Sequence, residues 1–172
     1  MRTKLVIFGV VFLSLLLQCS LMPAISIASV TPNLMIVLVV SFGLMRGKRS
    51  GMLLGFLCGL LTDLMLGPIV GFRAFIYMFI GYFCGYCYRI FYDDDVKMPM
   101  LLTAAGDLAY GILVYSTQFL LRGRVNFFFY LKRIILPEMI YTILLTLILY
   151  RLLLLLNRKL DQMDKRSVDS FV

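Results

Sequence analysis

The sequence predicts an all-α polytopic membrane protein with six transmembrane helices, and three observations support this fold class. First, 62% of the 172 residues are hydrophobic and only 15% are charged, and the mean hydropathy is +0.95. A water-soluble domain does not carry so apolar a composition. Second, six apolar segments approach the roughly 20 residues that a helix needs to cross a bilayer. Third, lysine and arginine gather in alternate connections between these segments, as on the cytoplasmic side of membrane proteins.

We expect the six helices at these apolar segments, in chain order. The segments are 5–22, 30–45, 51–66, 69–88, 99–121 and 134–156. The second and third have only 16 residues each, so they are expected to stand upright or to be shielded by neighbouring helices. The fourth follows a Gly67-Pro68 turn, because proline favours the first turn of a helix. Residues 157–172 remain as a short, charged cytoplasmic tail, so residues 1–172 form a single integral membrane domain.

The distribution of positive charge predicts that both termini are cytoplasmic. Eleven lysines and arginines flank the spans on this side and four lie on the other, and the basic side stays inside during insertion. The four exceptions, Arg122, Arg124, Lys132 and Arg133, surround the aromatic residues 127–130. This basic aromatic loop is expected at the lipid headgroups or against a partner. A signal peptide ending near Ala28 is the alternative interpretation of the first segment, but an uncleaved span keeps the charge pattern consistent.

Glycines recur every fourth residue from the end of the second segment through the third, at positions 43, 47, 51, 55 and 59. Positions four apart share one face of a helix, and a glycine face allows a second backbone to approach closely in a membrane. Gly81 and Gly85 repeat this spacing in the fourth segment. We therefore predict helix packing at Gly47, Gly51, Gly55, Gly59, Gly81 and Gly85, rather than a substrate pore, with 51–66 as a central, tightly packed helix.

The composition also argues against several kinds of chemistry. The chain has no histidine, which removes imidazole bases and imidazole metal ligands. Its four cysteines lie at 19, 58, 84 and 87, and the Cys84–Cys87 pair is more consistent with reduced packing residues than with a redox motif. The net charge of +8 fits cytoplasmic loops and anionic membrane lipids better than nucleic acid. We expect no metal, no cofactor and no nucleic-acid partner.

Four ionisable residues lie within the predicted spans: Asp63, Arg73, Asp107 and Glu138. A charge in hydrocarbon is costly unless it pairs or faces a polar cavity, so these residues are the candidate partner-binding or structural groups. Asp63, Arg73 and Glu138 are expected at a similar shallow depth near the outer face. We expect Asp63 and Arg73 to form an ion pair that holds the hairpin of the third and fourth spans. Glu138 completes that cluster or pairs with Lys132 or Arg133.

Asp107 is expected about 12 Å from the cytoplasmic end of its helix, by the rise of about 1.5 Å per residue. Its form there is either a protonated carboxyl or a carboxylate that accepts hydrogen bonds from hydroxyl groups. Intramembrane aspartyl proteases also contain two buried aspartates, but that family needs Tyr-Asp and Gly-x-Gly-Asp motifs on facing helices, and the predicted spans contain only Gly106-Asp107. We therefore predict no catalytic residue and no enzyme activity.

One part of the chain resembles a known family. Pro32-Asn33 opens the second span, and a basic turn and Gly55-Phe56-Leu57-Cys58-Gly59-Leu60-Leu61-Thr62-Asp63 follow. Gly67-Pro68-Ile69-Val70-Gly71-Phe72-Arg73-Ala74 then leads into the fourth span. This order resembles the bacterial rod shape-determining protein MreD over residues 31–86, with Asn33 where aspartate is commoner and Arg73 where histidine or asparagine is more usual. The family also resembles, in fold, the six-helix substrate-binding S-component subunits of energy-coupling-factor transporters.

The resemblance implies a noncatalytic membrane scaffold of the elongation machinery in the bacterial plasma (inner) membrane. Such a protein binds MreC directly and helps to control cell shape and lateral peptidoglycan synthesis. It is linked to MreB and to RodA with its transpeptidase, directly or indirectly, and to membrane lipids; a homodimer is also left open. The alternative function is the substrate-binding subunit of a vitamin-type transporter, in which Asp63, Arg73 and Glu138 line a substrate cavity.

Overall fold

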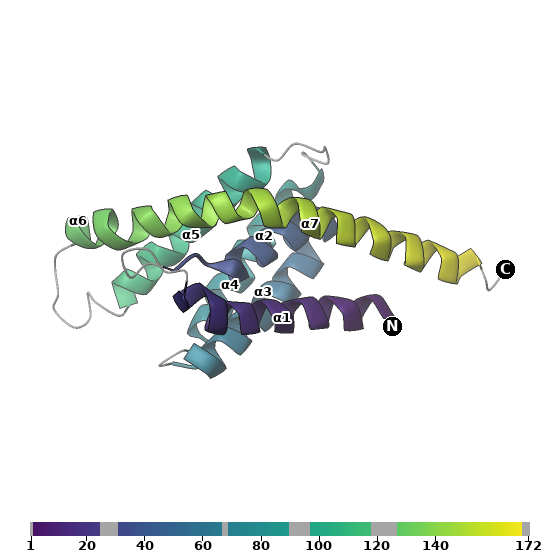
Figure 1. Ribbon diagram of the computed structural model, residues 1–172, viewed down its shortest axis with the longest axis horizontal. Coiled ribbons are helices and arrows are strands. Elements are labelled where there is room, and N and C mark those ends of the chain that lie inside the picture. The colour runs from purple at the N-terminus through teal and green to yellow at the C-terminus, as the bar shows by residue number, and fades with distance from the viewer. Residues whose placement is uncertain (1, 25–30, 67–68, 90–96, 118–126, 170–172) are drawn as a thin grey trace.

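The computed structural model describes residues 2–24, 31–66, 69–89, 97–117 and 127–169 (Figure 1). Every regular element within these ranges is helical, which confirms the all-α fold. The six long helices are α1 (Arg2–Ala24), α2 (Leu34–Arg46), α3 (Lys48–Leu66), α4 (Phe72–Tyr86), α5 (Lys97–Tyr115) and α7 (Leu136–Asp169). The short η1 (Cys87–Arg89) extends α4, and α6 (Phe127–Tyr130) and η3 (Leu131–Ile135) lead directly into α7.

Lengths and hydropathies of these helices differ from one another. The described stretches Lys97–Tyr115 and Leu131–Leu160 are long and apolar enough to cross a membrane, and Leu5–Ser20 and Leu34–Arg46 are shorter apolar helices. The 13 residues of α2 extend only about 20 Å, less than the roughly 30 Å of a hydrocarbon core. Long and short apolar helices in one bundle are consistent with a polytopic membrane protein, in which longer helices shield the shorter ones.

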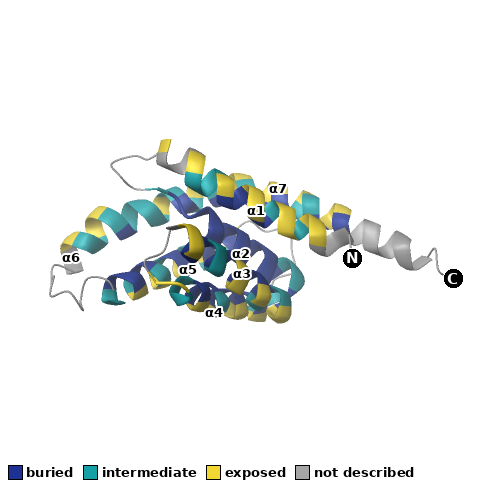
Figure 2. Cartoon of the chain, turned by 90° about the horizontal axis from the view of Figure 1, so that it is seen from below, coloured by how far each residue is buried: buried dark blue, intermediate teal, exposed yellow. Residues whose placement is uncertain are grey.

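The central helix of the bundle is α2, which contacts each of the other five long helices. Every residue from Leu34 to Leu44 is buried, as the dark blue α2 in Figure 2 shows. The expectation that 51–66 forms the central helix is therefore wrong, because α3 exposes Leu53, Phe56 and Leu64. The physical reason is that α2 is apolar on all sides and must be enclosed, whereas the glycines of α3 line only one face.

A glycine seam joins α3 to α4. A Cβ atom added to Gly51 would overlap the Gly81 carbonyl oxygen, and one added to Gly55 would overlap the Tyr77 carbonyl oxygen. At Gly59 the obstructing backbone is that of Ala74. The two antiparallel backbones are thus in contact along most of α3, which gives dispersion energy that larger side chains would prevent.

Gly85 and Gly47 complete the seam at its basic end. A Cβ atom on Gly85 would lie 2.6 Å from the Cα atom of Lys48. Gly47 is not inside a helix: its φ of +81° ends α2 and allows α3 to begin at the next residue. A left-handed conformation of this kind strains any residue with a Cβ atom, so Gly47 makes the reversal of the chain rather than a packing face.

The basic ends of α2 and α7 lie together. Arg46 at the end of α2 donates from Nε to Oδ1 of Asn157 on α7, at 2.7 Å, and Figure 1 shows the start of α1 toward the same end of the molecule. The short tail expected from residue 157 onward is helical as far as Asp169. Polar residues can continue an established helix once its first turns are formed, and the cytoplasmic location of this tail stays a prediction.

The basic aromatic segment is helical where it is described, and it is continuous with α7 rather than a loop. Pro137 has no backbone N–H, so the regular bond to the carbonyl four residues earlier is missing there. In the turn before it, η3 widens into a π-helix in which the Leu136 N–H donates to the Leu131 carbonyl oxygen, five residues back, a common adjustment within helices. Ala28, the Gly67-Pro68 turn, and Arg122 with Arg124 lie outside the described residues.

The glycine seam generates a stability prediction. Gly55→Ala should lower the free energy of unfolding by about 1–3 kcal/mol, because overpacking separates two backbones in contact. Gly9→Ala in α1 is the matched control, since a Cβ atom there meets nothing within 4 Å. Thermal unfolding of the two purified variants in detergent measures the difference. Equal melting temperatures for the two variants would contradict the seam.

Candidate functional site: a polar cavity enclosed by six helices

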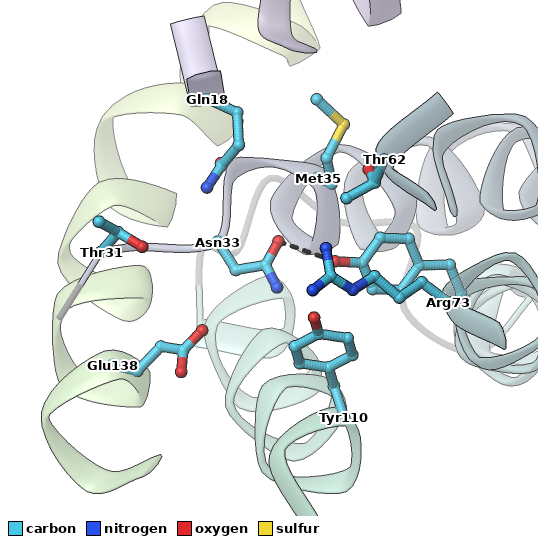
Figure 3. A pocket seen from close by; sticks show the side chains of 9 residues that line it. Gln18, Thr31, Asn33, Met35, Thr62, Arg73, Tyr110 and Glu138 are labelled. Carbon is cyan, nitrogen blue, oxygen red and sulfur yellow. Dashed lines mark hydrogen bonds between the residues drawn. The ribbon is translucent and has the colours of Figure 1, made fainter. Parts of the chain in front are cut away.

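A cavity of about 200 Å³ lies at the end of the bundle opposite the basic turn. All six long helices, or the residues that lead into them, contribute to its wall (Figure 3). Its described lining residues are Gln18, Thr31, Asn33, Met35, Thr62, Arg73, Tyr77, Tyr110 and Glu138. Eight of these nine side chains carry a polar group, which is unusual for the interior of an apolar bundle and indicates a site that holds water or a polar ligand.

The start of α2 forms one wall of the cavity, and side chains from two other helices hold its backbone. Gln18 on α1 donates to the Pro32 carbonyl oxygen at 3.1 Å and accepts from the Leu34 N–H at 2.8 Å. The Asn33 N–H donates to Oγ1 of Thr142 on α7 at 3.2 Å. Because the first N–H groups of a helix have no partner within the helix, these contacts replace the water that hydrocarbon lacks.

Asn33 has two roles at this position. Its side-chain oxygen accepts from the Ile36 N–H at 3.3 Å, which caps α2, and from the Tyr77 hydroxyl at 3.1 Å. The Tyr77 ring in turn packs against the Tyr110 ring, with 5.3 Å between their centroids. One family-motif residue therefore connects the central helix to α4, and through the two rings to α5.

Asp63 caps α4 as well as pairing with Arg73. Its Oδ2 atom accepts from the backbone N–H groups of Gly71 at 2.9 Å, Arg73 at 2.9 Å and Ala74 at 3.2 Å. The ion-pair contact, from Arg73 Nε to Oδ1 of Asp63, is longer at 3.9 Å. With Asp63 only 1% exposed, the carboxylate holds the α3–α4 hairpin chiefly through the positive end of α4.

Arg73 and Glu138, expected at the same depth, line the same cavity. In the described part of the chain no ion pair joins Arg73 to Glu138, and Glu138 pairs with neither Lys132 nor Arg133, both of which are exposed. The structure thus keeps a cation and a carboxyl group apart across a polar space.

Asp107 is 3% exposed and lies outside the cavity wall. The Thr142 side chain is within hydrogen-bonding reach of its carboxyl group. Its Oδ1 atom and the hydroxyl of Thr103, one turn earlier on α5, have no hydrogen-bond partner among the described residues. The two groups form a second buried polar position next to the α7 threonines.

Several residues of this site are not singled out by the sequence analysis. These residues are uncharged, so the presence of charge within a span does not identify them. They are Gln18, Thr62, Tyr77, Tyr110 and Thr142. Gln18 offers the clearest signal, since an amide within an unbroken apolar run needs a partner. Within the described residues, no group of three or more side chains suited to a metal ion is present.

The fold and the cavity define a helical, multi-pass membrane protein whose buried polar groups organise helix ends. Over residues 1–160 the chain matches the family model described as rod shape-determining protein MreD, and it belongs to that family. The chain is therefore a noncatalytic membrane protein with a role in determining rod shape. No curated protein and no solved structure matches it.

The cap on α4 predicts different effects for two substitutions of Asp63. Asp63→Ala should reduce the free energy of unfolding by at least about 2 kcal/mol, because three N–H groups lose their acceptor. Asp63→Asn retains one acceptor oxygen and should cost less than half as much. Thermal unfolding in detergent compares the two. Equal losses would show that the ion pair with Arg73 dominates instead.

The contact at the start of α2 gives a second prediction. Thr142→Val keeps the volume of the side chain but leaves the buried Asn33 N–H without its acceptor, which should cost about 1–3 kcal/mol. Thr117→Val is the control, because the described bonds of the Thr117 hydroxyl go to nearby carbonyl groups, those of Leu113 and Val114. Thermal unfolding in detergent measures both variants. If both have the same melting temperature as the unmodified chain, Thr142 does not hold α2.

Proposed function

We propose that this chain is a noncatalytic membrane scaffold of the bacterial elongation machinery that binds MreC and thereby helps to control lateral peptidoglycan synthesis. The observation that carries the proposal is the family match over residues 1–160. A noncatalytic protein that determines rod shape must act through other proteins, and MreC is the direct partner that the family resemblance implies. Contacts with MreB, and with RodA and its transpeptidase, follow through the same assembly.

The internal packing limits where such a partner can bind. The glycine face of α3 is not free for a partner span, because α4 occupies it along Gly51, Gly55 and Gly59. A partner must therefore pack on exposed apolar side chains. On α4 these are Phe75, Phe79, Tyr82, Phe83 and Tyr86, and on α7 they are Ile140, Leu144, Leu147, Ile148, Leu152 and Leu155. Aromatic side chains are enriched at protein interfaces, which favours the α4 face for a partner and the aliphatic α7 face for lipid.

The orientation in the membrane is part of the same proposal. The basic turn between α2 and α3 and the basic end of α7 lie together through Arg46 and Asn157. Positive charge on one side of a bundle favours the cytoplasm for that side. The termini are then cytoplasmic, the cavity faces outward, and the six long helices act as six spans in an arrangement similar to transporter S-component subunits.

The cavity favours a second candidate function, the substrate-binding subunit of a vitamin-type transporter. Such subunits bind their substrate in a pocket between helices, and a polar pocket with both a cation and a carboxyl group is of that kind. A deletion strain distinguishes the two functions, because loss of a transport subunit abolishes vitamin uptake, whereas loss of the scaffold abolishes rod shape.

Photo-crosslinking in living cells tests the scaffold. A photoreactive amino acid replaces Phe79 on α4, Ile148 on α7 or the fully buried Val39 on α2. We expect a crosslink to MreC from position 79, weaker or no crosslinking from 148, and none from 39. No crosslink to MreC from either exposed position, with normal rod shape and lost vitamin uptake in the deletion strain, would overturn the scaffold in favour of the transport subunit.

A further inference from the structure

The cavity contains hydrogen-bond donors that the protein itself does not use. The Arg73 side chain is 17% exposed, and its one ion-pair contact in the described structure runs from Nε to Asp63 at 3.9 Å. The two terminal nitrogens of the guanidinium group have no protein acceptor within the described ranges. A planar guanidinium with both terminal nitrogens available is suited to bind the two oxygens of a carboxylate or phosphate group.

Asn33 supplies a second donor next to Arg73. Its side-chain oxygen accepts from the Ile36 N–H and the Tyr77 hydroxyl. Among the described residues its amide nitrogen has no acceptor, so it can donate to a ligand. The residue as a whole is 7% exposed. Figure 3 shows the Asn33, Arg73 and Tyr110 side chains directed into one space. The positive end of α2 begins directly behind them, at Leu34. All of these features favour an anionic group at this side of the cavity.

The opposite side of the cavity has the opposite preference. Glu138 projects from α7 into the same space. In the structure as described, Glu138 pairs with no lysine or arginine, so its carboxyl group can accept a hydrogen bond from a ligand. The region has two other acids. Asp63 uses Oδ2 for three backbone N–H groups at the start of α4, and its Oδ1 atom is fully buried beside Arg73. Asp107 lies outside the cavity wall. The cavity thus offers donors on one side and one acceptor on the other.

The size of the cavity restricts what can bind there. About 200 Å³ is more than the roughly 150 Å³ of an engineered protein cavity that binds benzene. This is enough for a compact polar group. An anionic group that also carries an ammonium, amide or hydroxyl donor matches the two sides of the cavity.

We propose that this cavity is a binding site for a carboxylate or phosphate group that carries a neighbouring hydrogen-bond donor. Arg73 and the Asn33 amide hold the anionic oxygens, and Glu138 accepts from the donor. The group belongs either to a free small molecule or to the headgroup of a membrane phospholipid. The site is separate from the exposed helix faces at which partner binding is proposed. Ligand binding to the purified chain therefore tests this proposal, and crosslinking in cells tests the scaffold independently.

Binding to the purified full-length chain in detergent tests the site. The probes are O-phosphoethanolamine, which is soluble, and phosphatidylethanolamine, which is a lipid with the same headgroup; phosphatidylcholine, whose ammonium cannot donate, is the reference. Native mass spectrometry and the shift in melting temperature report binding. Preference for the lipid over O-phosphoethanolamine identifies a headgroup site, and saturable binding of the soluble probe identifies a small-molecule site. Either result supports the proposal.

Variants assign the binding to the cavity. Arg73→Gln should weaken the bound probe about tenfold or more, because charge-assisted hydrogen bonds to the anion are lost. Lys132→Gln is the matched control, since it removes an exposed cation from the same end of the bundle. If Arg73→Gln does not yield folded protein, Arg73→Lys and Glu138→Gln replace it, each with an expected loss of several fold. The proposal is overturned if neither probe binds the unmodified chain more tightly than phosphatidylcholine does. It is also overturned if the folded cavity variants bind the probe with the same affinity as the unmodified chain.

Discussion

The structure depends on one constraint: the first backbone N–H groups of α2 are buried inside the bundle, and each needs a hydrogen-bond partner there. The 13-residue helix is too short to reach a membrane surface at both ends. Gln18 on α1 and Thr142 on α7 bond the backbone of residues 32–34, and Asn33 bonds its own helix. Three helices are fixed relative to one another by these contacts, and the polar cavity is the space that they leave.

The second organising feature is the hairpin of α3 and α4, which packs against α2. Its glycine seam brings two backbones into contact, and the Asp63 carboxylate then lies beside the first turn of α4. This arrangement brings Arg73 to the cavity without its being fully neutralised, since its contact to Asp63 is 3.9 Å. A charge that costs about 2.5–3.5 kcal/mol at the centre of a bilayer is kept where it can serve a ligand.

Much of this arrangement is predictable from the sequence. Hydropathy predicts the helical segments, the four-residue glycine spacing predicts close packing, and the intramembrane charges lead to Arg73 and Glu138. The sequence does not show that α2 is central, because an apolar run reads the same whether it faces lipid or protein. It does not show the cap by Asp63 either, because that contact depends on where the α3–α4 hairpin closes. Gln18 and Thr142 act through single hydrogen bonds to backbone groups, which leave no periodic pattern.

Hydrogen–deuterium exchange of the chain in lipid nanodiscs tests the central constraint most directly. If side chains of α1 and α7 hold the start of α2, the amides of residues 33–36 exchange as slowly as those of residues 37–44. Gln18→Leu then accelerates exchange at residues 33–36 and leaves residues 37–44 unchanged. Rapid exchange at residues 33–36 in the unmodified chain, comparable to that of a loop, would contradict the account.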